Sequence, residues 1–192
     1  PHALDESVSD AYRVYFPELD LTFTNESIVK ESLSISEALM DGSNIEFVGC
    51  IAASLKIKLY NVQANVKGKH IYVYVTAGET DEVPIFRGKV ESAKIQAEHA
   101  FKEIEAYDEI YYAGQKEIAT WYNSISYPTT LGSIRTSLQT QLGLNTDSGV
   151  TLINDGITIP EKQYENAQSI KAISILKSVC QANGVFGAIR KT

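Results

Sequence analysis

The chain reads ASLKIKLYNV from Ala53 to Val62, and along it the apolar side chains alternate with lysine and tyrosine side chains. A period of two residues places Leu55, Ile57 and Leu59 on one face of a β-strand. One face of this strand is therefore expected to lie in a core while the other faces solvent, a pattern typical of antiparallel sheets.

Several other segments before residue 108 carry the same kind of pattern and are rich in β-branched and aromatic residues. We predict further strands at Leu19–Thr24, Leu33–Ile35, His70–Thr76, Val83–Ile95 and Ala100–Ala106. A short helical turn over Ile35–Met40 is an alternative to strand there, and Val66–Lys69 is predicted to be a hairpin-like loop. Six or more short strands without a strong helical pattern predict an antiparallel barrel or sandwich.

After Asp108 the period of the apolar residues changes to that of helices. We predict helices over Gln115–Ser124, over Leu131–Leu142 and from Ile170 to Asn183. Thr129 or Thr130 is expected to cap the second helix and Ser169 the third, while Gly143 and Gly184 end them. The remaining predicted elements are a strand or hairpin around Asn154-Asp155-Gly156 and a last strand over Val185–Ile189.

The charge distribution divides the chain near the same place. The 192 residues carry 17 Lys and Arg against 24 Asp and Glu, a net charge of −7. Residues 1–110 hold 19 acidic and 10 basic residues, whereas residues 111–192 hold 5 acidic and 7 basic ones. We predict an N-terminal arm over 1–18, a β-barrel domain over 19–110 and a small α/β domain over 111–192. The chain lacks an initiator Met, so either its start is processed or it is a fragment of a longer chain. Because the last predicted strand lacks a partner, we expect the small domain to be truncated and the natural chain to continue.

Composition argues against several classes of protein. An acidic chain without a dense Lys/Arg cluster is a poor candidate for nucleic-acid binding, because phosphate contacts depend on those cations. No apolar run reaches the 18 residues or so of a transmembrane helix, and the N-terminus has no signal-peptide pattern.

The cysteine and histidine residues match no recognisable disulfide or metal-binding motif in the sequence. Cys50 and Cys180 are too few for a disulfide framework and lack metal-ligand neighbours, so we expect two small buried side chains. His2, His70 and His99 show no HExxH or His-x-His spacing, which favours surface or structural histidines. We predict no metal and no cofactor.

Paired carboxylates are further candidates for catalysis, but an outward-facing strand shows the same pattern, which favours a solvated face over a catalytic pair. They are Asp81/Glu82, Glu103/Glu105 and Asp108/Glu109. Tyr72 and Tyr74 share a strand face suited to protein or sugar contacts. Single glycines within strand patterns, Gly49 and Gly88, indicate bulges or close backbone approach. No catalytic residue is assigned.

A series of segments, in this order and spacing, carries a resemblance to a known family. The segments are Leu19–Phe23, Ser27–Leu39, Ile45–Cys50, Ile85–Val90, Ile104–Asp108, Ala119–Asn123, Leu152–Gly156 and Val179–Gly187. Together they resemble the N-terminal region of tail-hub proteins of Gram-positive phages and prophages, also called tail-associated lysins or minor tail proteins. These are similar to the split-barrel hubs of contractile tails and of type VI spike proteins.

The resemblance implies an α+β fold, with an antiparallel split-barrel hub domain followed by a small mixed α/β domain. It also implies a structural role without catalysis in these residues: three copies form a ring at the virion tail tip, after synthesis in the host cytoplasm. The implied partners are the distal tail protein, the tape-measure protein and tail fibre or lysin modules, and a lytic module would lie C-terminal to this segment.

Two alternatives remain open on the residues alone. The first is a carbohydrate-binding β-module of a secreted or surface enzyme, which needs coplanar aromatic rings on a sheet face, whereas Trp121 lies in a predicted helix. The second is a small hydrolase, which needs a cleft that brings Glu103 or Asp108 near another acid.

Overall fold

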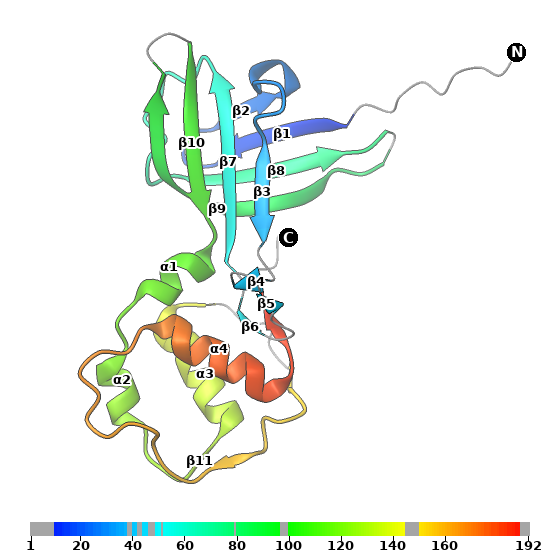
Figure 1. The fold of residues 1–192 in the computed structure, drawn as a ribbon. Coiled ribbons are helices and arrows are strands. Elements are labelled where there is room, and N and C mark those ends of the chain that lie inside the picture. The colour runs from blue at the N-terminus through cyan, green and yellow to red at the C-terminus, as the bar shows by residue number, and fades with distance from the viewer. Residues whose placement is uncertain are drawn as a thin grey trace, which may run out of the picture. The chain divides into compact units, whose positions relative to one another are not determined.

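The computed structural model describes residues 10–37, 40–41, 44–45, 49–50, 52–78, 80–96, 100–144 and 150–188. The described residues form two compact units, and each unit is built from separate stretches of the sequence. The first unit comprises the described residues of 10–36 and 53–108, and the second comprises those of 37–52 and 109–188. Figure 1 shows the elements of both units.

The first unit is built on an antiparallel sheet of seven strands in the order β2-β1-β8-β9-β10-β7-β3. The strands are β1 (Ala11–Phe16), β2 (Leu21–Thr24), β3 (Ser34–Glu37), β7 (Ala53–Tyr60), β8 (His70–Thr76), β9 (Val83–Ile95) and β10 (Phe101–Tyr107). Along β7 the side chains of Ala53, Leu55, Ile57 and Leu59 are buried, as their alternation predicts. The sequence-based prediction of a half-buried strand is therefore confirmed here.

The sheet rolls around its core instead of lying flat. Val14 of β1 and Ile104 of β10 belong to the same buried cluster, although β8 and β9 lie between their strands in the sheet. The register of β9 slips by one residue against β8 between Val73 and Tyr74, and again against β10 between Glu105 and Ala106. Bulges of this kind bend and twist a strand. They allow the long β9 to pair with β8 along its first half and with β10 along its second half.

The ring of hydrogen bonds is not closed among the described residues, because β2 and β3 lie at opposite ends of the strand order. The chain itself connects these two edges through the 3-10 turn η1 (Asn25–Ser27) and the residues that follow it. Ile28 bridges to Leu59, and the Val29 amide donates to the Lys58 carbonyl at 2.9 Å. The α+β class with a large antiparallel sheet is confirmed, in the form of a rolled, open sheet.

Three local predictions for this unit differ from the structure. Residues 11–16, expected in an N-terminal arm, form β1, which pairs with both β2 and β8. The loop at Val66–Lys69 is not a hairpin, because the strands that it joins, β7 and β8, are not neighbours in the sheet. Residues 34–37 are strand instead of helical turn, while residues 38–39 lie outside the described ones.

The second unit packs four helices against short paired strands. The helices are α1 (Glu109–Gln115), α2 (Ala119–Ser124), α3 (Leu131–Leu142) and α4 (Ala172–Asn183). The paired strands are β4 (Met40–Asp41) with β5 (Asn44–Ile45), β6 (Gly49–Cys50) with β13 (Phe186–Gly187), and β11 (Thr129–Thr130) with β12 (Thr158–Ile159). Its core includes Ile110, Leu138, Leu142, Ala172 and Leu176.

The helix predictions for this unit are confirmed for α2, α3 and α4, whereas α1 has no counterpart among them. The Ser169 cap is wrong: α4 begins at Ala172 after Lys171, and the Ser169 hydroxyl donates instead to the Glu117 carboxylate. The predicted hairpin at 150–159 is a turn followed by β12, and β12 pairs with β11. The described residues of 37–52, a range expected in the barrel, belong to this unit because β6 pairs with β13 and packs on α4.

Candidate functional site

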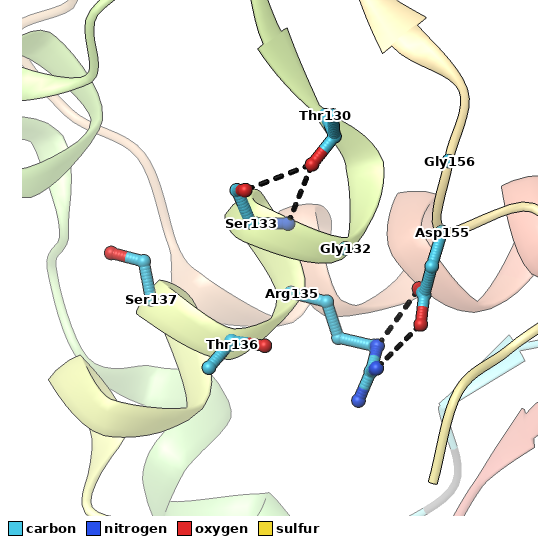
Figure 2. Close-up of a pocket in the computed structure, with 8 residues that line it drawn as sticks. All are labelled: Thr130, Gly132, Ser133, Arg135, Thr136, Ser137, Asp155 and Gly156. Atoms are coloured by element: carbon cyan, nitrogen blue, oxygen red, sulfur yellow. Dashed lines mark hydrogen bonds and ion pairs between the residues drawn. The ribbon is translucent and has the colours of Figure 1, made fainter. Parts of the chain in front are cut away.

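The first residues of α3 line an open hollow of about 710 Å³ on the second unit (Figure 2). Its lining residues are Thr130, Gly132, Ser133, Arg135, Thr136, Ser137, Asp155 and Gly156. They come from Thr130 at the end of β11, from α3, and from the turn at residues 152–156, hereafter the anchored turn. The hollow is therefore formed where two segments about 20 residues apart in sequence meet.

Local signals in the sequence fix the start of α3. The Thr130 hydroxyl accepts a hydrogen bond from the Ser133 amide at 3.2 Å, as predicted for the cap of this helix. The Leu131 amide donates to the Ile157 carbonyl and the Gly132 amide to the Asp155 carbonyl, each at 2.9 Å. A Cβ atom on Gly132 would lie 2.9 Å from the Asp155 Cβ, so this close approach requires glycine.

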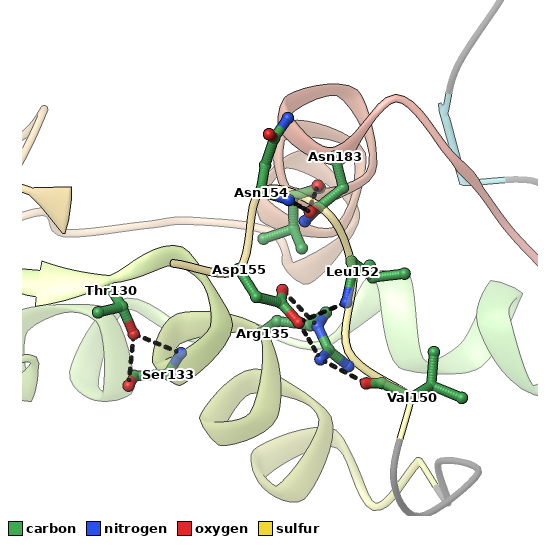
Figure 3. Close-up of polar contacts among 9 residues, drawn as sticks. Thr130, Ser133, Arg135, Val150, Leu152, Asn154, Asp155 and Asn183 are labelled. Carbon is green, nitrogen blue, oxygen red and sulfur yellow. Dashed lines mark hydrogen bonds and ion pairs between the residues drawn. The ribbon is translucent and has the colours of Figure 1, made fainter. Parts of the chain in front are cut away.

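An ion pair joins the anchored turn to α3 (Figure 3). Arg135 donates to both carboxylate oxygens of Asp155, from Nε at 3.0 Å and from Nη2 at 2.6 Å. The two side chains are only 15% and 11% exposed. Asp155 also accepts from the Leu152 amide at 2.8 Å, and Arg135 donates to the Val150 carbonyl at 3.0 Å. Bidentate, partly buried pairs of this kind fix geometry more strongly than surface pairs do.

A second pair of residues joins the anchored turn to α4. The Asn154 amide donates to Asn183 Oδ1 at 3.3 Å, and Asn154 Nδ2 donates to the Ala182 carbonyl at 2.6 Å. Asn183 is itself buried and donates to the Val179 carbonyl at 3.2 Å. Between these two attachments Ile153 is 90% exposed. The anchored turn thus presents an apolar side chain on a rigid support.

The Arg135–Asp155 contacts hold the anchored turn in position against α3. The Arg135 guanidinium holds the pKa of the Asp155 carboxyl below its usual range, chiefly through the side-chain hydrogen bond, although burial opposes this shift. A carboxylate that accepts three hydrogen bonds and is held ionised is a poor general acid or base.

The lowered pKa of Asp155 predicts that acid weakens the second unit. Because the folded pKa lies below the ordinary value of 3.8, the contribution of the carboxylate is present above that value and is lost as the pH falls through the folded pKa. Urea unfolding followed by fluorescence of Trp121, the single tryptophan, is expected to give a constant midpoint from about pH 7 to 5 and a falling one below about 4. Asp155→Asn is expected to flatten that fall, and an unchanged acid profile in this variant would contradict the assignment.

The paired carboxylates considered from the sequence are not brought together in a cleft. Glu105 forms an ion pair with Lys56 at 3.0 Å, and Glu103 accepts from Gln96 Nε2 at 3.0 Å. Glu82 pairs with Arg13, which lowers the Glu82 pKa through that hydrogen bond, although burial opposes the shift. Asp108 is buried and accepts from the Ala53 amide at 2.8 Å, a contact that ties the end of β10 to the start of β7. These contacts account for Glu82, Glu103, Glu105 and Asp108 as structural groups.

The remaining candidate side chains have structural contacts as well. His70 Nδ1 lies 2.6 Å from Glu18 Oε1, and the His70 amide also donates to this carboxylate, whereas His2 and His99 lie outside the described residues. Burial raises the Glu18 pKa, but the hydrogen bonds from His70 outweigh it, and the pKa is lowered. In the part of the chain that the structure describes, no group of three or more His, Cys, Asp or Glu side chains is arranged to hold a metal ion.

Tyr72 and Tyr74 lie on one face of β8, as the alternation predicts. An arginine guanidinium group lies over each of the two rings. The Arg13 guanidinium lies 4.1 Å from the Tyr74 ring centroid, and the Arg87 guanidinium lies 5.1 Å from that of Tyr72. Tyr15 packs edge-on against Tyr72. A sugar stacking on these rings would compete with the arginines, which weighs against the carbohydrate-binding alternative.

Sequence reasoning missed two long-range pairings in the second unit. Arg135 is the one basic residue between Lys116 and Lys162, but its partner Asp155 lies 20 residues further along the chain, and no local pattern in the sequence indicates this pair. Cys50 and Cys180 are both buried, as predicted, but the sequence did not indicate that they lie together, with a hydrogen bond between their thiols. Among the described residues no helix is long and apolar enough to span a membrane.

Comparison with known proteins was informative at the level of the fold. No protein-family model and no curated protein matches the sequence. Among solved structures the chain is similar to the 43 kDa tail protein of prophage MuSo2 from Shewanella oneidensis, with a TM-score of 0.53 and 14% identity over 89% of this chain and 47% of that one. A chain from the virion of a native gene transfer agent particle gives a TM-score of 0.35 and 13% identity over 63% of this chain and 45% of that chain. The chain thus spans about half the length of the MuSo2 tail protein and shares the fold of that part.

Proposed function

We propose that this chain is a structural component of the tail of a phage or phage-like particle, at the tail tip or baseplate hub. The observation that carries the proposal is the similarity to the MuSo2 tail protein, which extends through both units and covers 89% of the chain. The order of sequence segments that resembles phage tail hubs is a second, separate support. In this role the protein is made in the host cytoplasm and ends up in the virion.

The proposed assembly is a ring of three copies that closes the end of the tail tube. Neighbours in such a ring meet through two different faces, which must be complementary. The uneven charge of the chain suits this arrangement, because residues 1–110 carry an excess of 9 acidic residues and residues 111–192 an excess of 2 basic ones. Parts of opposite charge favour contacts between neighbouring copies and disfavour contacts between like parts.

The proposed partners are the distal tail protein, the tape-measure protein, and fibre or lysin modules. We assign no catalysis to this segment, and place any lytic activity of the full-length protein C-terminal to it. The contacts of Glu82, Glu105 and Asp108 support this assignment, since cations or backbone amides already engage these carboxylates.

The direct test uses particles from a strain that encodes the gene. Purified particles are digested, and peptides of this chain are quantified by mass spectrometry against a major tube protein of the same particles. The expected result is a low, fixed number of copies per particle, in multiples of three. Absence of the chain from intact particles would contradict the proposal.

A further inference from the structure

Two cysteine side chains that are 130 residues apart in sequence share one small space in the second unit. Cys50 lies in β6 and Cys180 in α4, and their relative exposures are 9% and 8%. Gly187 of β13 lies opposite Cys50 in the parallel pair β6–β13. A Cβ atom built on Gly187 would lie 3.0 Å from Cys180 Sγ and 3.3 Å from Cys50 Sγ. Both sulfur atoms therefore pack over the same glycine, and the absence of a side chain there gives them room.

The contact between the two side chains also favours the thiolate form of Cys180. The hydrogen bond with Cys50 lowers the pKa of Cys180 to about 7, with a smaller contribution from the Gly187 backbone and with burial acting in the opposite sense. A substantial thiolate fraction is then present near neutral pH, and the thiolate is the form that reacts with oxidants. A second thiol in contact is what a resolving cysteine requires.

We propose that Cys50 and Cys180 form a reversible intramolecular disulfide when the protein meets a peroxide oxidant. The proposal does not depend on the proposed function, since it rests on the contact between these side chains.

The chemistry balances with one peroxide per pair. The Cys180 thiolate attacks one oxygen of hydrogen peroxide and the O–O bond breaks, which leaves a sulfenic acid on Cys180 and releases hydroxide. The hydroxide takes up the proton that Cys180 lost on ionisation and becomes the first water molecule. The Cys50 sulfur then attacks the Cys180 sulfur, the S–O bond breaks, and water leaves. Two thiols are oxidised by two electrons to one disulfide, and the peroxide is reduced to two water molecules.

The bond would attach β6 covalently to α4. The strands β4, β5 and β6 are only two residues long, and β6 is attached through its pairing with β13 and its packing on α4. A covalent link from β6 to α4 closes a loop of about 130 residues, which restricts the unfolded chain strongly. The oxidised protein is therefore expected to melt about 5–10 °C above the reduced protein.

The test treats the full chain with equimolar hydrogen peroxide at neutral pH. The expected result is loss of both titratable thiols, a fall in mass by two hydrogen atoms, and a non-reduced digest that links the Cys50 peptide to the Cys180 peptide. Dithiothreitol is expected to reverse all three changes and to return the melting temperature to that of the reduced protein.

Two matched variants distinguish disulfide formation between the two cysteines from oxidation of a single thiol. In Cys50→Ala no second thiol can react with the sulfenic acid at Cys180, so the mass of the protein is expected to rise through added oxygen. In Cys180→Ala the Cys50 thiol is expected to react at least 10-fold more slowly than the wild-type pair. Sulfinic acid on the wild-type protein, a disulfide-linked dimer, or two unchanged thiols would each overturn the proposal. The wild-type digest decides the matter even if a variant fails to fold.

Discussion

Replacing Gly88 by alanine is expected to destabilise the first unit by about 3 kcal/mol, at the upper end of the usual cost of overpacking a core. A Cβ atom at this position of β9 would overlap the Tyr107 carbonyl oxygen and would lie 2.7 Å from the Phe86 ring. Neither neighbour can give way easily, because Tyr107 belongs to the backbone of β10 and Phe86 is buried in the core. The added methyl group must therefore displace β9 from β10 where their register slips.

Hydrogen–deuterium exchange resolves this effect within the first unit. Amides of β9 and β10 are expected to exchange about 100-fold faster in Gly88→Ala than in the wild-type protein. Gly156→Ala is the matched control, since a Cβ atom there has no neighbour within 4 Å, and it is expected to change stability by less than about 0.5 kcal/mol. Equal exchange rates in Gly88→Ala and the wild-type protein would contradict the described contact between β9 and β10.

Asp155→Ala is expected to destabilise the second unit by about 3 kcal/mol. Removal of the carboxylate leaves the largely buried Arg135 guanidinium without its bidentate partner and the Leu152 amide without its acceptor. Breaking a buried pair from one side costs about 3–5 kcal/mol, and the small remaining exposure of both side chains places this pair at the lower end. The anchored turn then loses its attachment to α3.

Trp121 fluorescence during urea unfolding measures this loss, because Trp121 packs on the core of the second unit and donates to Ser137 of α3 at 2.9 Å. Lys171→Ala is the matched control, because it breaks an ion pair with Glu117 in which both side chains are about half exposed, 48% and 49%. The control is expected to lose much less stability than Asp155→Ala. A comparable loss in the two variants would show that the Arg135–Asp155 pair has no special role.

The sequence predicted those strands and helix ends that are determined by residues close to one another along the chain. The alternation over Ala53–Tyr60 predicts β7, and Thr130 and Gly143 predict both ends of α3, because capping is decided within one helical turn. The Ser169 cap failed for a long-range reason: Glu117, 52 residues away, takes the hydroxyl as a donor. The neighbours of β7 were likewise not predictable from the loop at Val66–Lys69, since the rolling of the whole sheet selects them.

The candidate site was less predictable than the fold. The Asn154-Asp155-Gly156 turn was recognised from its composition, but its partners Arg135 and Asn183 come from two helices, 20 and 29 residues away along the chain. The contact between Cys50 and Cys180 depends on the association of β6 with β13, which no local pattern indicates. Pairings of this kind are set by tertiary packing, so that they become visible only in the folded chain.

Immunogold labelling locates this chain on intact particles and so tests the proposed position at the tail tip. Antibodies raised against the purified chain, coupled to gold, are applied to particles from the encoding strain and viewed by electron microscopy. The account predicts label at the end of the tail distal to the capsid, and no label on particles from a strain in which the gene is deleted. Label along the tube or on the capsid, or labelling that is equal with and without the gene, would contradict the account.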